Sequence, residues 1–315
     1  MDLLGSEELG KRELPPIKYA VEGMIPEGYT VLSASPKIGK SWMVQQMCLA
    51  VAEGKDFLGK KTTQGVAIYF ALEDCEKFAQ DRQRIIGSRG AKDFKYVFDA
   101  PPMALGFTKE LDKLTKGIDN LRLVVIDTIR PIEYQPSARE SMVHCEYRTG
   151  KEFKDWADKR EVSLIAVTHD RKADSGDPLK KISGTGGVTA SADSIVMITK
   201  ENRFGNEAVM GITGRRVLSS VMKIRQNESC VWEVMGDDEY EDSRIRRALM
   251  AVADGETMCA KQIIDKALMK GIVLSESSRA VGTFIVNNID RLREDGINIE
   301  IIERGTASKL YRVKR

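Results

Sequence analysis

The sequence predicts an α/β protein with a mostly parallel sheet, followed by a small domain of helices and a strand pair. Between residues 29 and 168, near-continuous apolar runs alternate with segments of helical spacing, which is typical of βαβ units. Four β-like segments with short turns follow without a long helix between them, so we expect antiparallel strands that extend one edge of the sheet. Beyond an acidic stretch at 237–242, helical spacing recurs three times before a final hairpin.

Each expected element follows from its apolar pattern. The strands expected in the parallel part are 29–33, 65–72, 95–98, 121–127 and 162–168. The helices expected between them are 42–51, 76–86, 108–118 and 146–159. The antiparallel strands are expected at 194–199, 208–213, 219–224 and 230–235. The C-terminal helices are expected at 244–253, 259–269 and 277–294, and the last strands at 297–302 and 309–313.

These elements predict four parts of the chain. They are an N-terminal tail (1–14), an α/β domain (15–236), an acidic linker (237–242) and a C-terminal domain (243–315). The C-terminal domain carries 14 Lys and Arg against 9 Asp and Glu, which favours contact with nucleic acid there. Three helices followed by a hairpin are the layout of winged-helix DNA-binding domains.

Composition limits the class of protein. In a chain of 315 residues, 42% hydrophobic residues are enough for a substantial core. The 49 Lys and Arg nearly balance the 47 Asp and Glu, so overall charge alone does not indicate a nucleic-acid partner. Five scattered cysteines without a Cys-x-x-Cys pair indicate reduced thiols. The acidic N-terminus has no apolar segment of a signal peptide and no run is long enough to span a bilayer, so we expect a cytoplasmic protein without a membrane partner.

The most specific motif is a phosphate-binding loop at 34–41, between an apolar strand and a helix. The residues expected to bind the nucleotide are Ser35, Pro36, Lys37, Ile38, Gly39, Lys40, Ser41 and Trp42. Lys40 would reach the β- and γ-phosphates, and the Ser41 hydroxyl would bind Mg²⁺. Ala34 replaces the usual first glycine, and alanine resists a positive φ. We therefore expect ATP or GTP with Mg²⁺ as ligands.

Three polar residues follow apolar strands whose carboxyl ends would meet at one edge of the sheet. Asp127 is expected to hold Mg²⁺, the alternative being a helix-capping aspartate. Glu73 is the candidate for activating the attacking water, although it and Asp74 would also suit a cap of the next helix. His169 would contact the γ-phosphate, the alternative being a structural or exposed histidine.

Basic residues suggest two further roles. Arg171, Lys172, Lys180 and Lys181 flank a glycine- and serine-containing stretch suited to phosphate backbones, although an ordinary solvated loop is an equal alternative. Arg215 and Arg216 end a strand, and either would supply an arginine to the ATP of a neighbouring subunit.

Together these residues resemble the RepA-like hexameric helicase ATPases, a branch of the RecA/DnaB-type P-loop superfamily, over residues 15–235. The matching segments are EGMIPEG at 22–28, KIGKSW at 37–42, ALED at 71–74, VIDT at 125–128, THDRK at 168–172, ISGT at 182–185 and TGR at 213–215. The resemblance implies a RecA-like core in a homo-oligomeric ring, probable only as a hexamer, with ATP at the subunit interfaces. It also implies Glu73 as the catalytic carboxylate, His169 as the γ-phosphate sensor and Arg215 or Arg216 as the finger in trans.

By the same resemblance, the loop at 172–187 would face a central channel and track single-stranded DNA. The C-terminal segment resembles winged-helix domains only in layout. Its recognition helix would be 275–293, and its expected DNA contacts are Arg279, Asn287, Arg291, Arg304 and Lys309. The alternative is a helical domain that contacts protein.

The leading hypothesis is a DNA-stimulated ATPase acting as a replicative helicase of a plasmid, phage or integrated element, with a replication initiator or primase as partner. One alternative is a recombination or repair ATPase that forms filaments without unwinding. The other is a nucleotide-gated DNA-binding regulator.

Overall fold

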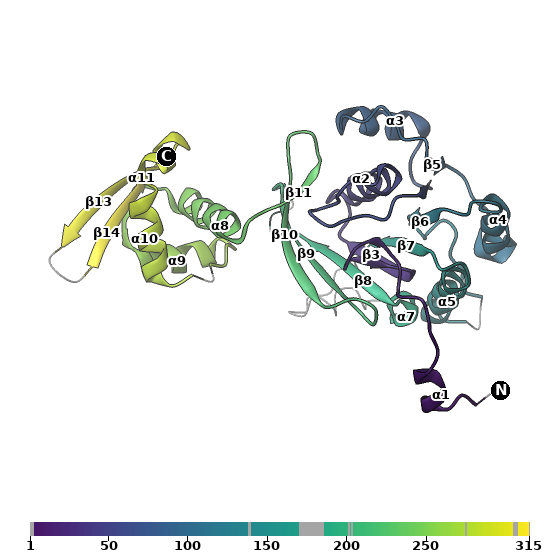
Figure 1. The fold of residues 1–315 in the computed structure, drawn as a ribbon. Helices are drawn as coiled ribbons and strands as arrows, with labels where there is room; N and C mark the ends of the chain where they lie inside the picture. Colours follow the sequence, from purple (N-terminus) through teal and green to yellow (C-terminus); the bar gives the residue numbers. More distant parts are fainter. Residues whose placement is uncertain are drawn as a thin grey trace. The chain divides into compact units, whose positions relative to one another are not determined.

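The computed structural model describes residues 3–137, 140–169, 186–200, 202, 204–274, 276–304 and 308–314. The chain divides into two compact units, Met1–Val234 and Met235–Arg315 (Figure 1). The end of the α/β domain expected at residue 236 lies close to this division. None of the helices in these described ranges is long and apolar enough to cross a membrane.

The first unit is built on a nine-stranded mixed sheet with the order β11-β10-β9-β8-β3-β7-β6-β4-β5. The parallel strands are β3 (Gly28–Ala34), β4 (Val66–Ala71), β5 (Phe94–Val97), β6 (Leu121–Asp127), β7 (Ser163–His169) and β8 (Ser194–Thr199). The antiparallel strands are β9 (Glu207–Gly214), β10 (Ser220–Gln226) and β11 (Trp232–Val234). The predicted α/β class and mixed sheet are confirmed.

One strand differs from the prediction in its direction. The segment at 194–199 was expected to be antiparallel, but β8 pairs parallel to β3, with Ala34 opposite Ile198. Residues 170–193 separate it from β7, and a connection of that length lets the chain return in the same direction. The antiparallel extension therefore begins only at β9.

Helices cover both faces of the sheet (Figure 1). They are α2 (Lys40–Glu53), α3 (Glu76–Ile85), α4 (Phe107–Leu114), α5 (Met142–Arg160) and α7 (Gly186–Ser191), with a 3₁₀ turn, η1 (Met103–Leu105). Alternate residues of β4 belong to two cores, since Tyr69 packs with α2 residues such as Met47, and Phe70 packs with α4 and α5 residues such as Phe107. Because both faces are covered, all residues of β3 and β4 are buried.

The N-terminal segment adds small elements. Its helix α1 (Ser6–Gly10) is exposed throughout, and β1 (Tyr19–Val21) and β2 (Ile25–Pro26) form a two-stranded antiparallel pair.

The strand register places the ends of the parallel strands side by side. Ala34 at the end of β3 pairs with His169 at the end of β7, and Ala71 at the end of β4 pairs with Asp127. Residues that follow these strands therefore meet at one edge of the sheet, where open α/β sheets bind ligands.

The second unit has its own core. Its elements are α8 (Asp237–Val252), β12 (Thr257–Cys259), α9 (Ala260–Met269), α10 (Ser278–Asn287), α11 (Ile289–Glu294), β13 (Asn298–Arg304) and β14 (Ser308–Lys314). Its three strands are antiparallel in the order β12-β14-β13. The sequence prediction missed β12, which is only three residues long, and joined α10 and α11 into one helix.

The acidic stretch at 237–242 is not a linker, because it forms the first turns of α8. Acidic residues are favourable near the N-terminus of a helix, where the helix dipole is positive. A run of carboxylates directly before an apolar helical pattern therefore also fits the start of that helix.

Candidate active site at the carboxyl edge of the sheet

The loop between β3 and α2 has the conformation of a phosphate-binding loop. Gly39 precedes the helix with φ +100°, in the left-handed region, and Lys37 also has a positive φ of 65°. Ala34 does not share this property, because it is buried inside β3 and paired on both sides. The replacement of glycine by alanine at this position is therefore compatible with the loop.

The Lys40 side chain lies inside the loop and is 5% exposed. Its Nζ donates hydrogen bonds to the carbonyl oxygens of Ala34 (2.7 Å) and Ser35 (3.0 Å). His169 Nδ1 lies 2.9 Å from the same nitrogen and accepts from it when the imidazole is neutral. The ammonium group is therefore held at the mouth of the loop, next to the end of β7.

Glu73 lies beside the ends of β6 and β7. Its Oε1 accepts a hydrogen bond from Thr128 Oγ1 (2.7 Å), and its Oε2 lies 3.8 Å from His169 Nε2. The side chain is 49% exposed, so the carboxylate remains open to solvent. Asp127 is buried, and its Oδ2 accepts from the Tyr69 hydroxyl at 2.7 Å. The two carboxylates are therefore held in different environments, one solvated and one buried.

These residues line one cavity of about 490 Å³. Its lining comprises Pro36, Lys37, Gly39, Lys40, Ser41, Trp42, Glu73, Arg82, Asp127, Thr128, His169, Gln226 and Cys230. Of the loop residues predicted to bind nucleotide, Ser35 and Ile38 are outside this lining, and Ile38 is buried in the core. Sequence reasoning missed Arg82, Thr128, Gln226 and Cys230, and only Thr128 carried a signal, since it follows the strand of Asp127.

The cavity also suits a magnesium ion. Ser41, Asp127 and Thr128 contribute a hydroxyl, a carboxylate and a second hydroxyl to its lining. Hard oxygen donors of this kind are the ligands that Mg²⁺ prefers, usually together with phosphate oxygens and water.

The environment of His169 lowers its pKa below the ordinary histidine value. Desolvation is the main cause and the Lys40 charge adds to it, while Glu73 and Asp127 oppose the shift. His169 is therefore neutral at pH 7, the form that accepts a hydrogen bond from Lys40.

This shift predicts a pH dependence of nucleotide hydrolysis. The rate should be level above about pH 6.5 and fall at lower pH, because protonation of His169 removes the acceptor for Lys40 and places a second positive charge beside it. The rate profile of a His169→Asn variant should lack this acid limb, since asparagine does not titrate. An unchanged acid limb in the variant would contradict the assignment.

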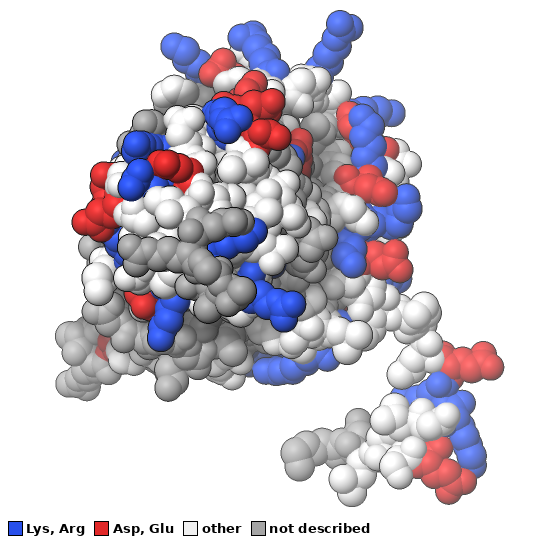
Figure 2. Space-filling model, turned by 90° about the vertical axis from the view of Figure 1, so that its left-hand side faces the viewer, with Lys and Arg blue, Asp and Glu red and all other residues white. Residues whose placement is uncertain are grey.

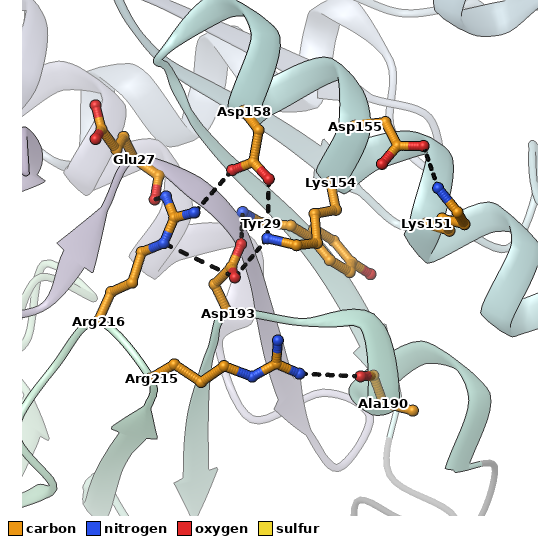
Figure 3. Close-up of polar contacts among 10 residues, drawn as sticks. All are labelled: Glu27, Tyr29, Lys151, Lys154, Asp155, Asp158, Ala190, Asp193, Arg215 and Arg216. Carbon is orange, nitrogen blue, oxygen red and sulfur yellow. Dashed lines mark hydrogen bonds and ion pairs between the residues drawn. The ribbon is translucent and has the colours of Figure 1, made fainter. Parts of the chain in front are cut away.

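The two candidate finger arginines lie at the opposite edge of the sheet (Figure 3). They follow Gly214, which pairs with Ser194 at the start of β8, whereas the phosphate loop follows Ala34 near the end of β8. Neither arginine lines the nucleotide cavity of its own chain.

Arg216 is held by its own chain, whereas Arg215 is exposed. The Arg216 guanidinium donates to Glu27 O and to Asp158 Oδ1, both at 3.0 Å, and lies 3.8 Å from Asp193 Oδ1. Arg215 makes one long contact, 3.5 Å from Nη2 to Ala190 O, and faces solvent (Figure 3).

The residues predicted to bind DNA are only partly described. Arg171, Lys172, Lys180 and Lys181 lie outside the described residues, as do the side chains of Arg291 and Arg304. Arg279, Asn287 and Lys309 line one groove of about 580 Å³ in the second unit, together with Lys261 and Tyr311. Figure 2 shows basic and acidic side chains interspersed over one face of the molecule. Any DNA contact there would depend on local groups.

A family model described as an AAA domain matches residues 4–175, which is more than half of the chain. The chain belongs to this family. Comparison with curated proteins gives no match. Solved structures that resemble this AAA domain protein show its fold, that of RecA/DnaB-type P-loop ATPases.

Three solved structures illustrate the likeness. An ATPase domain has a TM-score of 0.53 and 13% identity, and the match covers 67% of this chain and 85% of that one. A DnaB-like replicative helicase, whose structure was determined with its primase interactions, has a TM-score of 0.51 and 13% identity, over 66% of this chain and 57% of the helicase. A KaiC-like protein from the archaeon Pyrococcus horikoshii OT3 has a TM-score of 0.52 and 15% identity, over 70% of this chain and all of the other.

Proposed function

We propose that the protein is an ATP-dependent motor on DNA, a replicative helicase of a plasmid, phage or integrated element. One observation carries the proposal: a single cavity brings together Lys40, Glu73, Asp127 and His169. A cation for the phosphates, a solvated carboxylate for the attacking water and a buried carboxylate for the metal are the parts that ATP hydrolysis requires.

Each residue has a defined task in this mechanism. The loop N–H groups and Lys40 bind the β- and γ-phosphates. Glu73, oriented by Thr128, accepts a proton from the water that attacks the γ-phosphorus. Bound through Ser41 and Asp127, Mg²⁺ would neutralise charge on the phosphate oxygens. His169 lies between Lys40 and Glu73 and would report the loss of the γ-phosphate to the chain that follows β7.

The position of the finger arginine supports an interfacial site. Since Arg215 is exposed at the edge opposite the chain's own loop, it would complete the cavity of a neighbouring copy in a ring, by likeness a hexamer. Basic residues of the segment at 171–181 would then contact single-stranded DNA in the channel. The second unit would act as a winged-helix domain that binds DNA through Arg279 and Lys309, and a replication initiator or primase would be a further partner.

The test is ATP hydrolysis by the full chain with and without single-stranded DNA, together with the mass of the oligomer and a strand-separation assay. We expect stimulation by DNA, a ring-sized oligomer and unwinding of a forked duplex. Hydrolysis in filaments without unwinding would favour a recombination or repair ATPase. ATP binding without DNA-stimulated hydrolysis would overturn the motor and favour a nucleotide-gated regulator.

A further inference from the structure

The β10–β11 hairpin packs directly on the phosphate-binding loop. The indole Nε1 of Trp232 donates a hydrogen bond of 3.1 Å to the carbonyl oxygen of Gly39. A Cβ at Gly39 would lie 3.0 Å from the Trp232 ring and 2.8 Å from Gln226 Nε2, so these two side chains close over the glycine. Trp232 is only 1% exposed, which makes this contact part of the interior.

A side chain of α2 holds the same strand. Gln46 Oε1 accepts from the backbone N–H of Trp232, and Gln46 Nε2 donates to the backbone carbonyl of Trp232, both at 2.9 Å. Because β11 is at the edge of the sheet, this amide pairs backbone groups that a neighbouring strand would otherwise satisfy. The helix that begins at Lys40 and the strand β11 are therefore fastened at the backbone.

A third contact fixes the orientation of Gln226. Lys200 Nζ donates to Gln226 Oε1 at 3.3 Å, and Gln226 Nε2 donates to the Cys230 carbonyl, also at 3.3 Å. The Lys200 ammonium lies 5.2 Å from the centre of the Trp232 ring, a cation–π contact. Gln226 and Cys230 line the nucleotide cavity, so this hairpin is also one of its walls.

We propose that Gln46, Lys200, Gln226 and Trp232 form a clamp that positions the phosphate-binding loop before the nucleotide arrives. The inference rests on the proposed ATP site. Phosphate binding needs the loop N–H groups to point inward, which depends on the left-handed conformation of Gly39. The Trp232 indole fixes the Gly39 carbonyl, and therefore the adjoining peptide plane. Trp232 is a positioning residue: it acts through Gly39 and not on the nucleotide.

The clamp also links phosphate binding to β11. When the loop binds phosphate, the Gly39 carbonyl is held still, and the bond from Trp232 is strengthened in turn by thermodynamic reciprocity. β11 is the last strand of the first unit, and the chain continues from it directly into Met235 of the second. Occupation of the loop should therefore stabilise the strand that leads into the second unit.

A matched pair of substitutions tests the clamp, Trp232→Phe against Trp156→Phe. Trp156 is also buried, 5% exposed, and its Nε1 donates to Asp112 at 2.9 Å, but it packs in the other core with α4 and α5. Each change removes one indole hydrogen bond and keeps an aromatic ring. We expect Mg²⁺·ADP to bind about three- to tenfold more weakly to Trp232→Phe, the loss of one net hydrogen bond, and nearly as in the wild type to Trp156→Phe.

Hydrogen exchange gives a readout that general destabilisation would not produce. ADP at saturating concentration should slow amide exchange in residues 226–234 of the wild type and of Trp156→Phe, and much less in Trp232→Phe. Gln46→Met, which leaves the indole bond intact, should also lose this protection because the backbone attachment of β11 is gone.

The outcomes separate the two proposals. If the wild type binds no ADP, the proposed ATP site is wrong. If the wild type binds ADP and the two tryptophan variants have equal affinity and equal protection, the clamp is wrong and the ATP site stands.

Discussion

Replacing Glu73 by glutamine should lower kcat for ATP hydrolysis by about 10²–10⁴-fold, the usual contribution of a general base. The amide keeps the volume of the carboxylate and can still accept a hydrogen bond from Thr128, but it cannot take a proton from water. Binding of ATP should remain close to wild type, because Lys40 and the loop are unchanged. Single-turnover hydrolysis and equilibrium binding of ATP measure the two effects separately.

Glu76→Gln is the matched control. Glu76 is an exposed residue in the first turn of α3, three positions along the chain, and it does not line the cavity. Its substitution makes the same change of charge near the site and should leave kcat nearly unaltered. Comparable rates for Glu73→Gln and the wild type would remove Glu73 from the mechanism and point to another group as base.

The sequence was informative about this site because of a property of parallel sheets. Residues that follow neighbouring parallel strands meet at one edge, so Glu73, Asp127 and His169 could be placed together before any coordinates. The phosphate-binding loop identified the edge, and the buried apolar runs identified the strands. Each prediction needed only local pattern and the rule of strand direction.

Contacts between distant segments were not predictable in this way. Trp232 meets Gly39 across almost the whole first unit, and its strand is three residues long, so no local pattern marks the pairing. The direction of β8 was missed because period-2 alternation does not reveal whether a strand runs parallel or antiparallel. The doubled arginine at 215–216 was ambiguous for a similar reason, since only the fold places Asp158 and Asp193 beside one of the two.

That placement assigns the second large effect to Arg215. Arg215→Ala should lower kcat by about 10³-fold, the lower range for loss of an arginine finger, with little change in the stability of the monomer. Arg216→Ala should do the opposite first: it removes the partner of Asp158 and leaves the buried Asp193 with Lys154 alone among its printed ion pairs in the described residues. We therefore expect a lower melting temperature for Arg216→Ala, measured by calorimetry.

Mixing two inactive variants distinguishes an arginine acting across an interface from one acting within its own chain. Glu73→Gln subunits keep Arg215, and Arg215→Ala subunits keep Glu73. In randomly mixed rings of equal parts, about one quarter of interfaces would pair an intact Glu73 with an intact Arg215 from the neighbour, and hydrolysis should recover to that order. If Arg215 acted on its own chain's ATP, no mixture would contain a complete site, and activity would stay at the level of the separate variants. Because Arg215 and the phosphate loop lie at opposite edges of the same sheet, only the first result agrees with this fold.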